Sequence, residues 1–283
     1  MNPPGDADPN DLLVAVRSAL LDALDALQEH RDAVIVIGAQ AIYLQTGQAP
    51  VALAEATKDS DLVLDPRALH DDPRVEEAMR AAHFYPNPTS NQPGAWMNPA
   101  GIPVDLMVPE ALAGPGGRTA RGARIPPHDK RATRRARGLE ATLIDNALMT
   151  ITALDPTDTR SHTVKVAGLA GLLVAKLHKI AERVQAPDRL NDKDAHDIYR
   201  ILISTDTDVL AATFETLLVE PISQAPTRDA LDHLQELFAA GPTALGATMA
   251  GRAEEGIGEP ATVSLAVSIL AGDLLKALNA HES

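Results

Sequence analysis

The stretches Ile35-Val36-Ile37-Gly38-Ala39-Gln40 and Thr57-Lys58-Asp59-Ser60-Asp61-Leu62 decide how this 283-residue chain folds. The first is a short apolar, β-branched run that ends at a glycine, which indicates a buried strand that turns into a helix. In the second, two acidic residues open another apolar run, Leu62 to Leu64. Because residues i and i+2 of a strand point to the same face, Asp59 and Asp61 can share one divalent ion.

A third carboxylate lies within an apolar run, Val104-Asp105-Leu106-Met107. A carboxylate in a buried strand is costly unless it is paired or binds a metal, so Asp105 is a further candidate ligand. Carboxylate oxygens are hard ligands that suit Mg²⁺ or Mn²⁺. An Asp-x-Asp alone occurs by chance in many loops. The strand, glycine and helix before it and the third acid favour a site for a divalent ion.

Around these stretches, the hydrophobic periodicity predicts an α/β amino-terminal part. Leucine and valine residues at helical spacing indicate a helix from about Asp11 to Glu29, capped by Asn10 or Asp11. The other expected elements are a strand at 33–37, helices at 39–46 and 72–82, a hairpin that pairs 96–97 with 102–108 through a turn at 98–101, and strands at 141–144, 148–151 and 163–166.

After about residue 163 the pattern becomes helical. The expected helices lie at 167–184, 194–203, 209–218, 228–239 and 262–278. The predicted fold class is therefore α/β (α+β), with a mixed sheet in a first domain over residues 1–158 and an all-helical domain over residues 159–283.

Composition excludes several classes of protein. The chain has no cysteine, which excludes a disulfide scaffold, a thiolate metal site and a cysteine nucleophile. The first residues lack the basic and apolar regions of a secretory signal. The longest apolar stretch, Ala261 to Gly272, is too short to span a bilayer. We therefore expect a cytoplasmic protein without a membrane partner.

The net charge of −14 is unevenly distributed. The segment from Gly117 to Arg137 has eight basic residues and one acid, a net +7, which leaves −21 for the remainder. This asymmetry indicates either an anionic partner for one surface or a solvated basic loop, and charge alone favours neither. The basic residues are Arg118, Arg121, Arg124, Lys130, Arg131, Arg134, Arg135 and Arg137.

The two opening stretches, Ile35 to Gln40 and Thr57 to Leu62, and the later Val104-Asp105-Leu106 occur in this order. Together they resemble the minimal nucleotidyltransferase fold of the polymerase-beta type. Two later segments narrow the resemblance from this fold to one family. The segment from Leu172 to Arg183 is similar to the third motif of the AbiEii/MenT family of nucleotidyltransferase toxins. The segment Lys193-Asp194-Ala195-His196-Asp197-Ile198 is similar to the fourth. The resemblance covers roughly Ile35 to Leu202, and the last 80 or so residues carry no motif of the family.

The resemblance implies a role for each matching residue. Asp59 and Asp61 would hold Mg²⁺ or Mn²⁺ against the triphosphate of an NTP, and Asp105 would help at a second metal position. Lys176 would grip the triphosphate, and Asp194 would act as a base or orient a basic residue. The remaining nucleotide-binding candidates are Gly38, Ala39, Lys58, Lys179, Arg183 and Asp197.

Physical chemistry offers a second interpretation of the later motifs. Lys176, Lys179 and Arg183 share one helical stripe beside apolar residues, where lysine stems commonly cover apolar surface while their ammonium groups reach water. Asp194 and Asp197 are spaced as neighbours in the first turn of a helix, where acids interact favourably with the helix dipole.

The resemblance implies a toxin that adds nucleotides to the 3′ end of an RNA, with tRNA or another RNA as acceptor and a cognate antitoxin as protein partner. A monomer is expected. The low aromatic content, 2%, favours recognition of RNA by shape and charge over base stacking. Transfer of a nucleotide or phosphate to a protein hydroxyl, including one of the antitoxin, would use the same metal site.

Two departures from the family pattern favour another alternative, a nucleotide-binding module without chemistry. Ala39 stands where the family has Gly or Ser, and Glu55 stands where it has an Arg before the Asp-x-Asp.

Overall fold

The computed structural model describes residues 9–47, 58–116 and 120–281, which form two compact units. Unit 1 contains the described residues of Met1–Ala41, Glu55–Ala136 and Ala147–Val166, and unit 2 those of Ile42–Ala54, Arg137–Asn146 and Ala167–Ser283. The expected fold class is confirmed, since a mixed sheet is followed by helices. The units interleave along the chain, whereas we expected one boundary between residues 158 and 159.

The sheet has the strand order β3-β4-β5-β2-β1-β8-β7, and β6 pairs with β5 beside this path. Strands β1 and β2, like β4 and β5, are antiparallel, whereas β2 and β5 are parallel. Every residue of β1 is buried. The strands are β1 (Val34–Ile37), β2 (Ser60–Leu64), β3 (Tyr85–Pro86), β4 (Ala95–Met97), β5 (Pro103–Pro109), β6 (Arg134–Ala136), β7 (Asn146–Thr152) and β8 (Ser161–Ala167).

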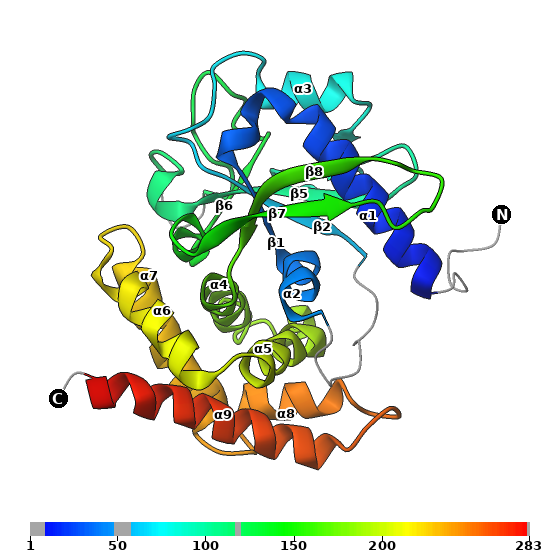
Figure 1. Ribbon diagram of the computed structural model, residues 1–283. Coiled ribbons are helices and arrows are strands. Elements are labelled where there is room, and N and C mark those ends of the chain that lie inside the picture. The colour runs from blue at the N-terminus through cyan, green and yellow to red at the C-terminus, as the bar shows by residue number, and fades with distance from the viewer. Residues whose placement is uncertain (1–8, 48–57, 117–119, 282–283) are drawn as a thin grey trace. The chain divides into compact units, whose positions relative to one another are not determined.

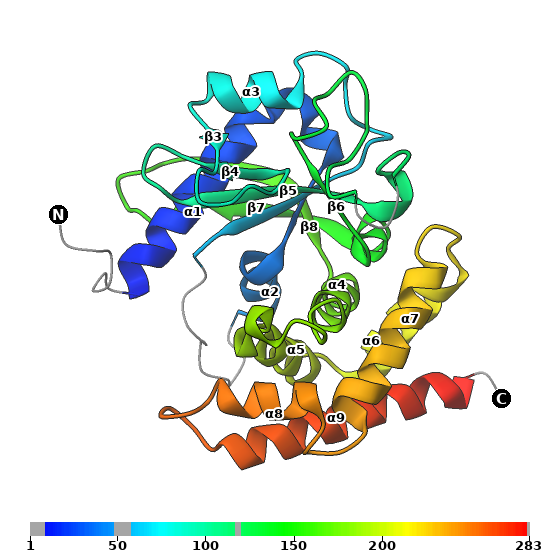
Figure 2. The same cartoon turned by 180° about the vertical axis from the view of Figure 1, so that it is seen from behind.

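Helices α1 (Pro9–Ala26) and α3 (Val75–Ala81) lie on the same face of the sheet in unit 1 (Figures 1 and 2). Val16 and Leu20 of α1 are fully buried, as their helical spacing predicted. Helix α1 begins at Pro9, so the expectation that Asn10 or Asp11 caps it is wrong.

Two further helical segments flank β1. A 3₁₀ helix (Gln28–Ala33) precedes β1, and α2 (Gly38–Thr46) follows it directly. Helix α3 begins three residues later than expected, because Arg74 is still extended, with φ −68° and ψ 146°.

Unit 2 is built mainly from helices. Helix α8 was not expected, because its eight residues are mostly small and its periodic signal is weak, yet Met249 is completely buried. Helices α8 and α9 lie side by side (Figures 1 and 2). The helices are α4 (Leu169–Ala181), α5 (Asp192–Ser204), α6 (Thr207–Val219), α7 (Gln224–Leu234) with a π-helical turn (Gln235–Ala239), α8 (Leu245–Arg252) and α9 (Pro260–His281).

The strand expected at 141–144 is wrong, because a 3₁₀ helix (Leu139–Leu143) occupies this segment. Gly138 precedes it in the left-handed region, with φ +86°. The Thr142 hydroxyl donates to the carbonyl oxygen of Leu139 at 2.7 Å. These local contacts favour a helical turn over an extended strand.

Helix α9 is the one described segment that is long and apolar enough, by length and composition, to cross a membrane, so the expectation that the apolar stretch from Ala261 is too short is wrong. It also has a buried face, on which Val267 and Ala271 are fully covered by protein and Leu274 almost so. A buried core helix has the same composition, so length and hydropathy do not separate the two classes of helix.

Candidate active site

Two of the three predicted metal ligands, Asp61 and Asp105, lie in one row across the sheet of unit 1. Ile37 of β1 is paired with Asp61 of β2, Asp61 with Asp105 of β5, and Asp105 with Ala95 of β4. Residues paired in register on adjacent strands point to the same face of a sheet. Asp61 and Asp105 therefore stand next to each other on one face. Asp59 lies just before β2, which begins at Ser60, so the expectation that Asp59 and Asp61 share a face of one strand is not met.

Gly38 brings the start of α2 against this row. It follows Ile37 directly and has φ +72°, a backbone conformation that glycine adopts readily. A Cβ atom at this position would collide with Oδ2 of Asp61. The Asp61 carboxylate thus packs against the backbone at the first turn of α2, and Ala39, which follows, is buried.

Asp105 is paired with Arg134, a residue that we assigned to the RNA-binding segment. Arg134 Nη2 donates to Asp105 Oδ2 at 2.9 Å, and its other terminal nitrogen donates to Gln92 Oε1 at 3.0 Å. The two charged side chains are 25% and 21% exposed. Strand β6 runs parallel to β5 and places Arg134 opposite Met107, two residues beyond Asp105. The tertiary structure therefore places this arginine beside a candidate metal ligand.

Asp59 and Asp61 have the donor chemistry that a hard divalent cation prefers. Both supply carboxylate oxygens, and Asp61 stands beside Asp105 in the sheet. Within residues 9–47, 58–116 and 120–281, no group of three or more His, Asp or Glu side chains is arranged to hold a metal ion. Arg134 forms an ion pair with Asp105, the residue that the resemblance implied for a second metal position. A positive side chain thus already lies beside this carboxylate.

The later motifs form a buried ion-pair cluster within unit 2. Lys176 Nζ of α4 donates to Asp194 Oδ1 at 2.7 Å and to Asp197 Oδ2 at 2.8 Å, both on α5. Lys179 Nζ donates to Asp194 Oδ1 at 2.8 Å. The Lys176 side chain is 9% exposed and that of Lys179 is 40% exposed. The cluster joins α4 to α5, and Lys179 lies at its solvent side.

Charge pairing sets the protonation states of this cluster. Burial alone would raise the pKa of Asp194, but the ammonium groups of Lys176 and Lys179 outweigh it and hold that pKa well below its usual range. Burial alone would lower the pKa of Lys176, but the two carboxylates outweigh it and raise that pKa. An ionised aspartate with a depressed pKa is a poor proton acceptor, so this geometry favours an orienting role for Asp194 over that of a base.

Arg183 lies beyond the end of α4, because the helix ends at Ala181 and not at residue 184 as expected. Its Nη1 is 3.5 Å from Asp194 Oδ2. Lys193, which begins the fourth motif, donates to the Tyr43 hydroxyl at 3.2 Å, and its Nζ lies 5.3 Å from the centroid of the Tyr43 ring.

The predicted RNA-binding residues divide into several groups. Arg118 lies outside the described residues, as does Glu55 of the family departure. Arg137, in unit 2, is paired with Asp229, and Arg135 donates to the Gly114 carbonyl oxygen at 2.7 Å. The exposed basic residues of the segment that belong to unit 1 and are described are Arg121, Arg124, Lys130 and Arg131.

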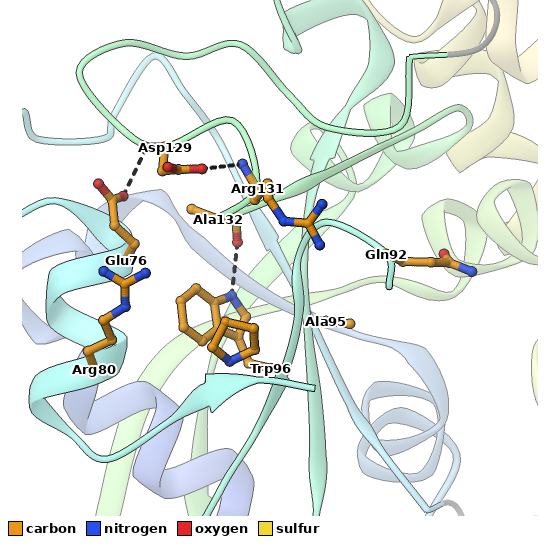
Figure 3. Close-up of a pocket in the computed structure, with 9 residues that line it drawn as sticks. Glu76, Arg80, Gln92, Ala95, Trp96, Asp129, Arg131 and Ala132 are labelled. Atoms are coloured by element: carbon orange, nitrogen blue, oxygen red, sulfur yellow. Dashed lines mark hydrogen bonds between the residues drawn. The ribbon is translucent and has the colours of Figure 1, made fainter. Parts of the chain in front are cut away.

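Arg131 lines a cavity of about 100 Å³ in unit 1 (Figure 3). The indole of Trp96, the one tryptophan of the chain, forms part of the wall, and its Nε1 donates to the Ala132 carbonyl oxygen at 2.9 Å. Arg80 of α3 adds a second guanidinium. Gln92, the acceptor of Arg134, also lines the cavity. A chain of polar contacts therefore links this cavity to Asp105.

Three buried polar residues of unit 1 were missed in the sequence. Arg17 of α1, Gln40 of α2 and Ser60 of β2 are hydrogen-bonded in series and almost fully buried. Arg17 lies four residues after Leu13 and three before Leu20, inside the apolar stripe of α1. A cation at such a position was a visible signal, because a buried charge requires polar partners.

Comparisons with known proteins leave the family open. No protein-family profile and no curated protein matches the chain. Among solved structures, a protein from H. pylori that carries the provisional name of nucleotidyltransferase aligns with 98% of this chain and 100% of its own. The two sequences are 12% identical and the TM-score is 0.31, a level at which no common fold is established.

Proposed function

We propose that this protein is a metal-dependent nucleotidyltransferase that transfers a nucleoside monophosphate from an NTP to the 3′ end of an RNA, with tRNA as the expected acceptor. The observation that carries the proposal is the row across the sheet, in which Asp61 stands beside Asp105 and packs against Gly38 at the start of α2. Carboxylates next to the first backbone N–H groups of a helix suit a complex of a cation with phosphates.

Each candidate residue of unit 1 has a role in this proposal. Asp59 and Asp61 would hold Mg²⁺ or Mn²⁺, and Arg134 keeps Asp105 in place. The bound ion would neutralise phosphate charge and lower the pKa of the attacking hydroxyl. Backbone N–H groups at Gly38 and Ala39 would bind a phosphate, with Lys58 as a further cation.

The proposed reaction is a displacement at the α-phosphorus of the NTP. The acceptor hydroxyl oxygen forms a bond to that phosphorus as the bond to the bridging oxygen of the β-phosphate breaks. Pyrophosphate leaves, and the hydroxyl proton is released to solvent. Positioning and charge neutralisation are the main demands that this reaction makes on a protein.

Lys179 and Arg183 are the phosphate-binding candidates of unit 2, with side chains 40% and 25% exposed. Asp194 pairs with both of these cations and would hold them in position. Lys176 is bound by Asp194 and Asp197 and would in turn orient Asp194. The roles assigned to this cluster stay predictions that rest on the motif resemblance.

The exposed basic residues of unit 1 support an anionic acceptor such as RNA. Phosphate contacts of lysine and arginine supply most of the affinity in such interfaces. Action as the toxin of a toxin–antitoxin system, a cognate antitoxin and a cytoplasmic location belong to the same proposal and rest on the resemblance and the composition.

Incubation with NTPs that carry label at the α- or the γ-phosphate tests the proposal, with total tRNA and purified protein as acceptors. We expect label from the α-phosphate in RNA and none from the γ-phosphate. Label from the α-phosphate in protein alone would establish nucleotide transfer to a protein instead. Label from the γ-phosphate would establish phosphoryl transfer, and no label with any NTP would indicate a binding module.

A further inference from the structure

A buried chain of hydrogen bonds connects α1 to Ser60, the first residue of β2, which lies between the candidate metal ligands Asp59 and Asp61. Arg17 Nε donates to Gln40 Oε1 at 2.8 Å, and Gln40 Nε2 donates to Ser60 Oγ at 2.8 Å. Gln40 Nε2 and Ser60 Oγ also donate to the carbonyl oxygen of Val16, at 3.3 and 3.1 Å. The exposed fractions of Arg17, Gln40 and Ser60 are 7%, 2% and 1%.

Donor and acceptor roles along this chain are fixed. A guanidinium can only donate, so Gln40 must turn its oxygen toward Arg17 and its amide nitrogen toward Ser60. Ser60 Oγ therefore accepts from Gln40 and gives its own proton to the Val16 carbonyl oxygen. One arrangement of hydrogen atoms satisfies all of these contacts, which makes the orientation of Ser60 well defined.

We infer that Arg17, Gln40 and Ser60 are positioning residues that set the orientation of Asp59 and Asp61. Ser60 and Asp61 are adjacent in β2 and so point to opposite faces, which means that a serine held toward α1 turns Asp61 toward the other face. Asp59 is joined directly to Ser60, so the same anchor fixes the backbone from which its side chain projects. The inference rests on the proposed function, because it concerns the carboxylates to which that function assigns the metal.

The same network also fixes the start of α2. Gln40 lies two residues after Gly38, within the first turn of the helix. The contact between Gly38 and Asp61 and the hydrogen bond between Gln40 and Ser60 therefore join the same two elements at two places. Helix α2 and strand β2 cannot shift relative to each other without breaking one of them.

Burying the guanidinium of Arg17 costs free energy that the packing of α1 on the sheet does not require. Burial lowers the pKa of its guanidinium, which measures the cost of removing the charge from water. Among the described residues no carboxylate pairs with it, and its partners are Gln40 and the Thr152 carbonyl oxygen, the latter at 3.0 Å. An apolar side chain of similar volume would pack α1 on the sheet without this cost.

Ser60→Ala provides the first test, because it removes one hydroxyl and leaves the volume almost unchanged. Mn²⁺ binding is measured by calorimetric titration, with the melting temperature recorded in parallel. We expect affinity for Mn²⁺ to fall about 10-fold, the lower end of the loss seen when a group that orients a metal ligand is removed, because Ser60 acts on the carboxylates through the backbone. Ser223→Ala is the matched control, because Ser223 is 0% exposed and its hydroxyl donates to the Leu217 carbonyl oxygen at 2.7 Å in unit 2.

The double variant Arg17→Met/Gln40→Met separates positioning from folding. It replaces both polar partners by apolar side chains, so that no charge remains buried and the melting temperature is expected to stay the same or rise. A positioning role predicts that Mn²⁺ affinity nevertheless falls. A purely structural role predicts that Mn²⁺ affinity stays at the wild-type level as long as the melting temperature does. If the double variant does not fold, the Mn²⁺ affinity of Ser60→Ala compared with that of Ser223→Ala tests the inference.

The outcomes separate the inference from the proposed function. Wild-type affinity in both Ser60→Ala and the double variant would overturn the inference and leave the proposed function intact. A wild-type protein that binds no Mn²⁺, or that binds it equally well after Asp59→Asn, would overturn the proposed function. The inference would then fail with it, since no ligand pair would exist to be positioned.

Discussion

Gly38 and Asp61 are in direct contact, so close that no side chain fits at position 38 without displacing the Asp61 carboxylate. The pairing of Ile37 with Asp61 in the sheet brings them together, and the φ of +72° at Gly38 turns the chain into α2 at that point. A strand end, a helix start and an acidic side chain thus meet at one glycine.

Gly38→Ala is expected to destabilise the protein by about 1–3 kcal/mol, because alanine is strained at a positive φ, and also to weaken Mn²⁺ binding, because its Cβ displaces Asp61. Gly101→Ala is the control, since Gly101 has φ +82° and nothing within 4 Å of an added Cβ. Urea unfolding and Mn²⁺ titration measure the two effects. Equal Mn²⁺ affinity in the two variants would contradict the role of the contact.

Asp59→Ala is expected to abolish transfer of α-phosphate label and to leave the melting temperature of the metal-free protein the same or higher. Carboxylates that lie close together repel each other without a cation, so the loss of one relieves that repulsion. Activity and thermal unfolding are measured on the same preparation. An unfolded variant would show that Asp59 is structural.

Lys176→Met and Lys179→Met are expected to differ sharply in stability. Loss of Lys176 leaves Asp194 and Asp197 buried without their main partner, a change that costs about 3–5 kcal/mol. Lys179 is 40% exposed, so its loss is expected to cost less than about 1 kcal/mol.

Nucleotide binding separates the two roles of the same cluster. If Lys179 binds phosphate, Lys179→Met lowers affinity for NTP while urea unfolding stays close to that of the wild type. Unchanged NTP affinity in this variant would remove Lys179 from the binding site.

Stability is expected to fall as the pH drops below about 6.5, the ordinary pKa of histidine. Burial is the largest cause that lowers the pKa of His30 and of His128, so both stay neutral in the folded protein while the unfolded chain takes up protons. The loss continues until the pH reaches the lowered pKa of the folded state. Urea unfolding at pH 7.5 and 5.5 measures it, and His128→Gln should make the dependence shallower.

Arg124→Gln/Lys130→Gln is expected to weaken RNA binding for all sequences. Both residues are exposed, and within the described chain neither side chain makes a hydrogen bond or an ion pair. Each lost phosphate contact should reduce the slope of log K against log salt by about 0.7 on single strands. Arg67→Gln is the control, since Arg67 is already paired with Asp65. A slope unchanged from the wild type would place the RNA elsewhere.

Local patterns predicted most of the fold. The apolar β-branched run before Gly38 predicted β1, and the turn at 98–101 predicted the hairpin of β4 and β5, because in both places neighbouring residues decide the conformation. The segment at 141–144 was mistaken for a strand, since its apolar composition concealed the local hydrogen bond from Thr142. Helix α8 was missed because its burial depends on α5 and α9.

By itself the sequence determined the α/β class, the strand–glycine–helix unit and the candidate ligands Asp59 and Asp61, since these depend on residue type and short spacing. Only the tertiary structure decided which charges meet. Arg134 reaches Asp105 because β6 pairs with β5, and Arg17 joins Ser60 through Gln40 because α1 packs on the sheet. Such contacts join residues about 20 or more positions apart, and the cost of burying a charge selects them only once the elements have packed.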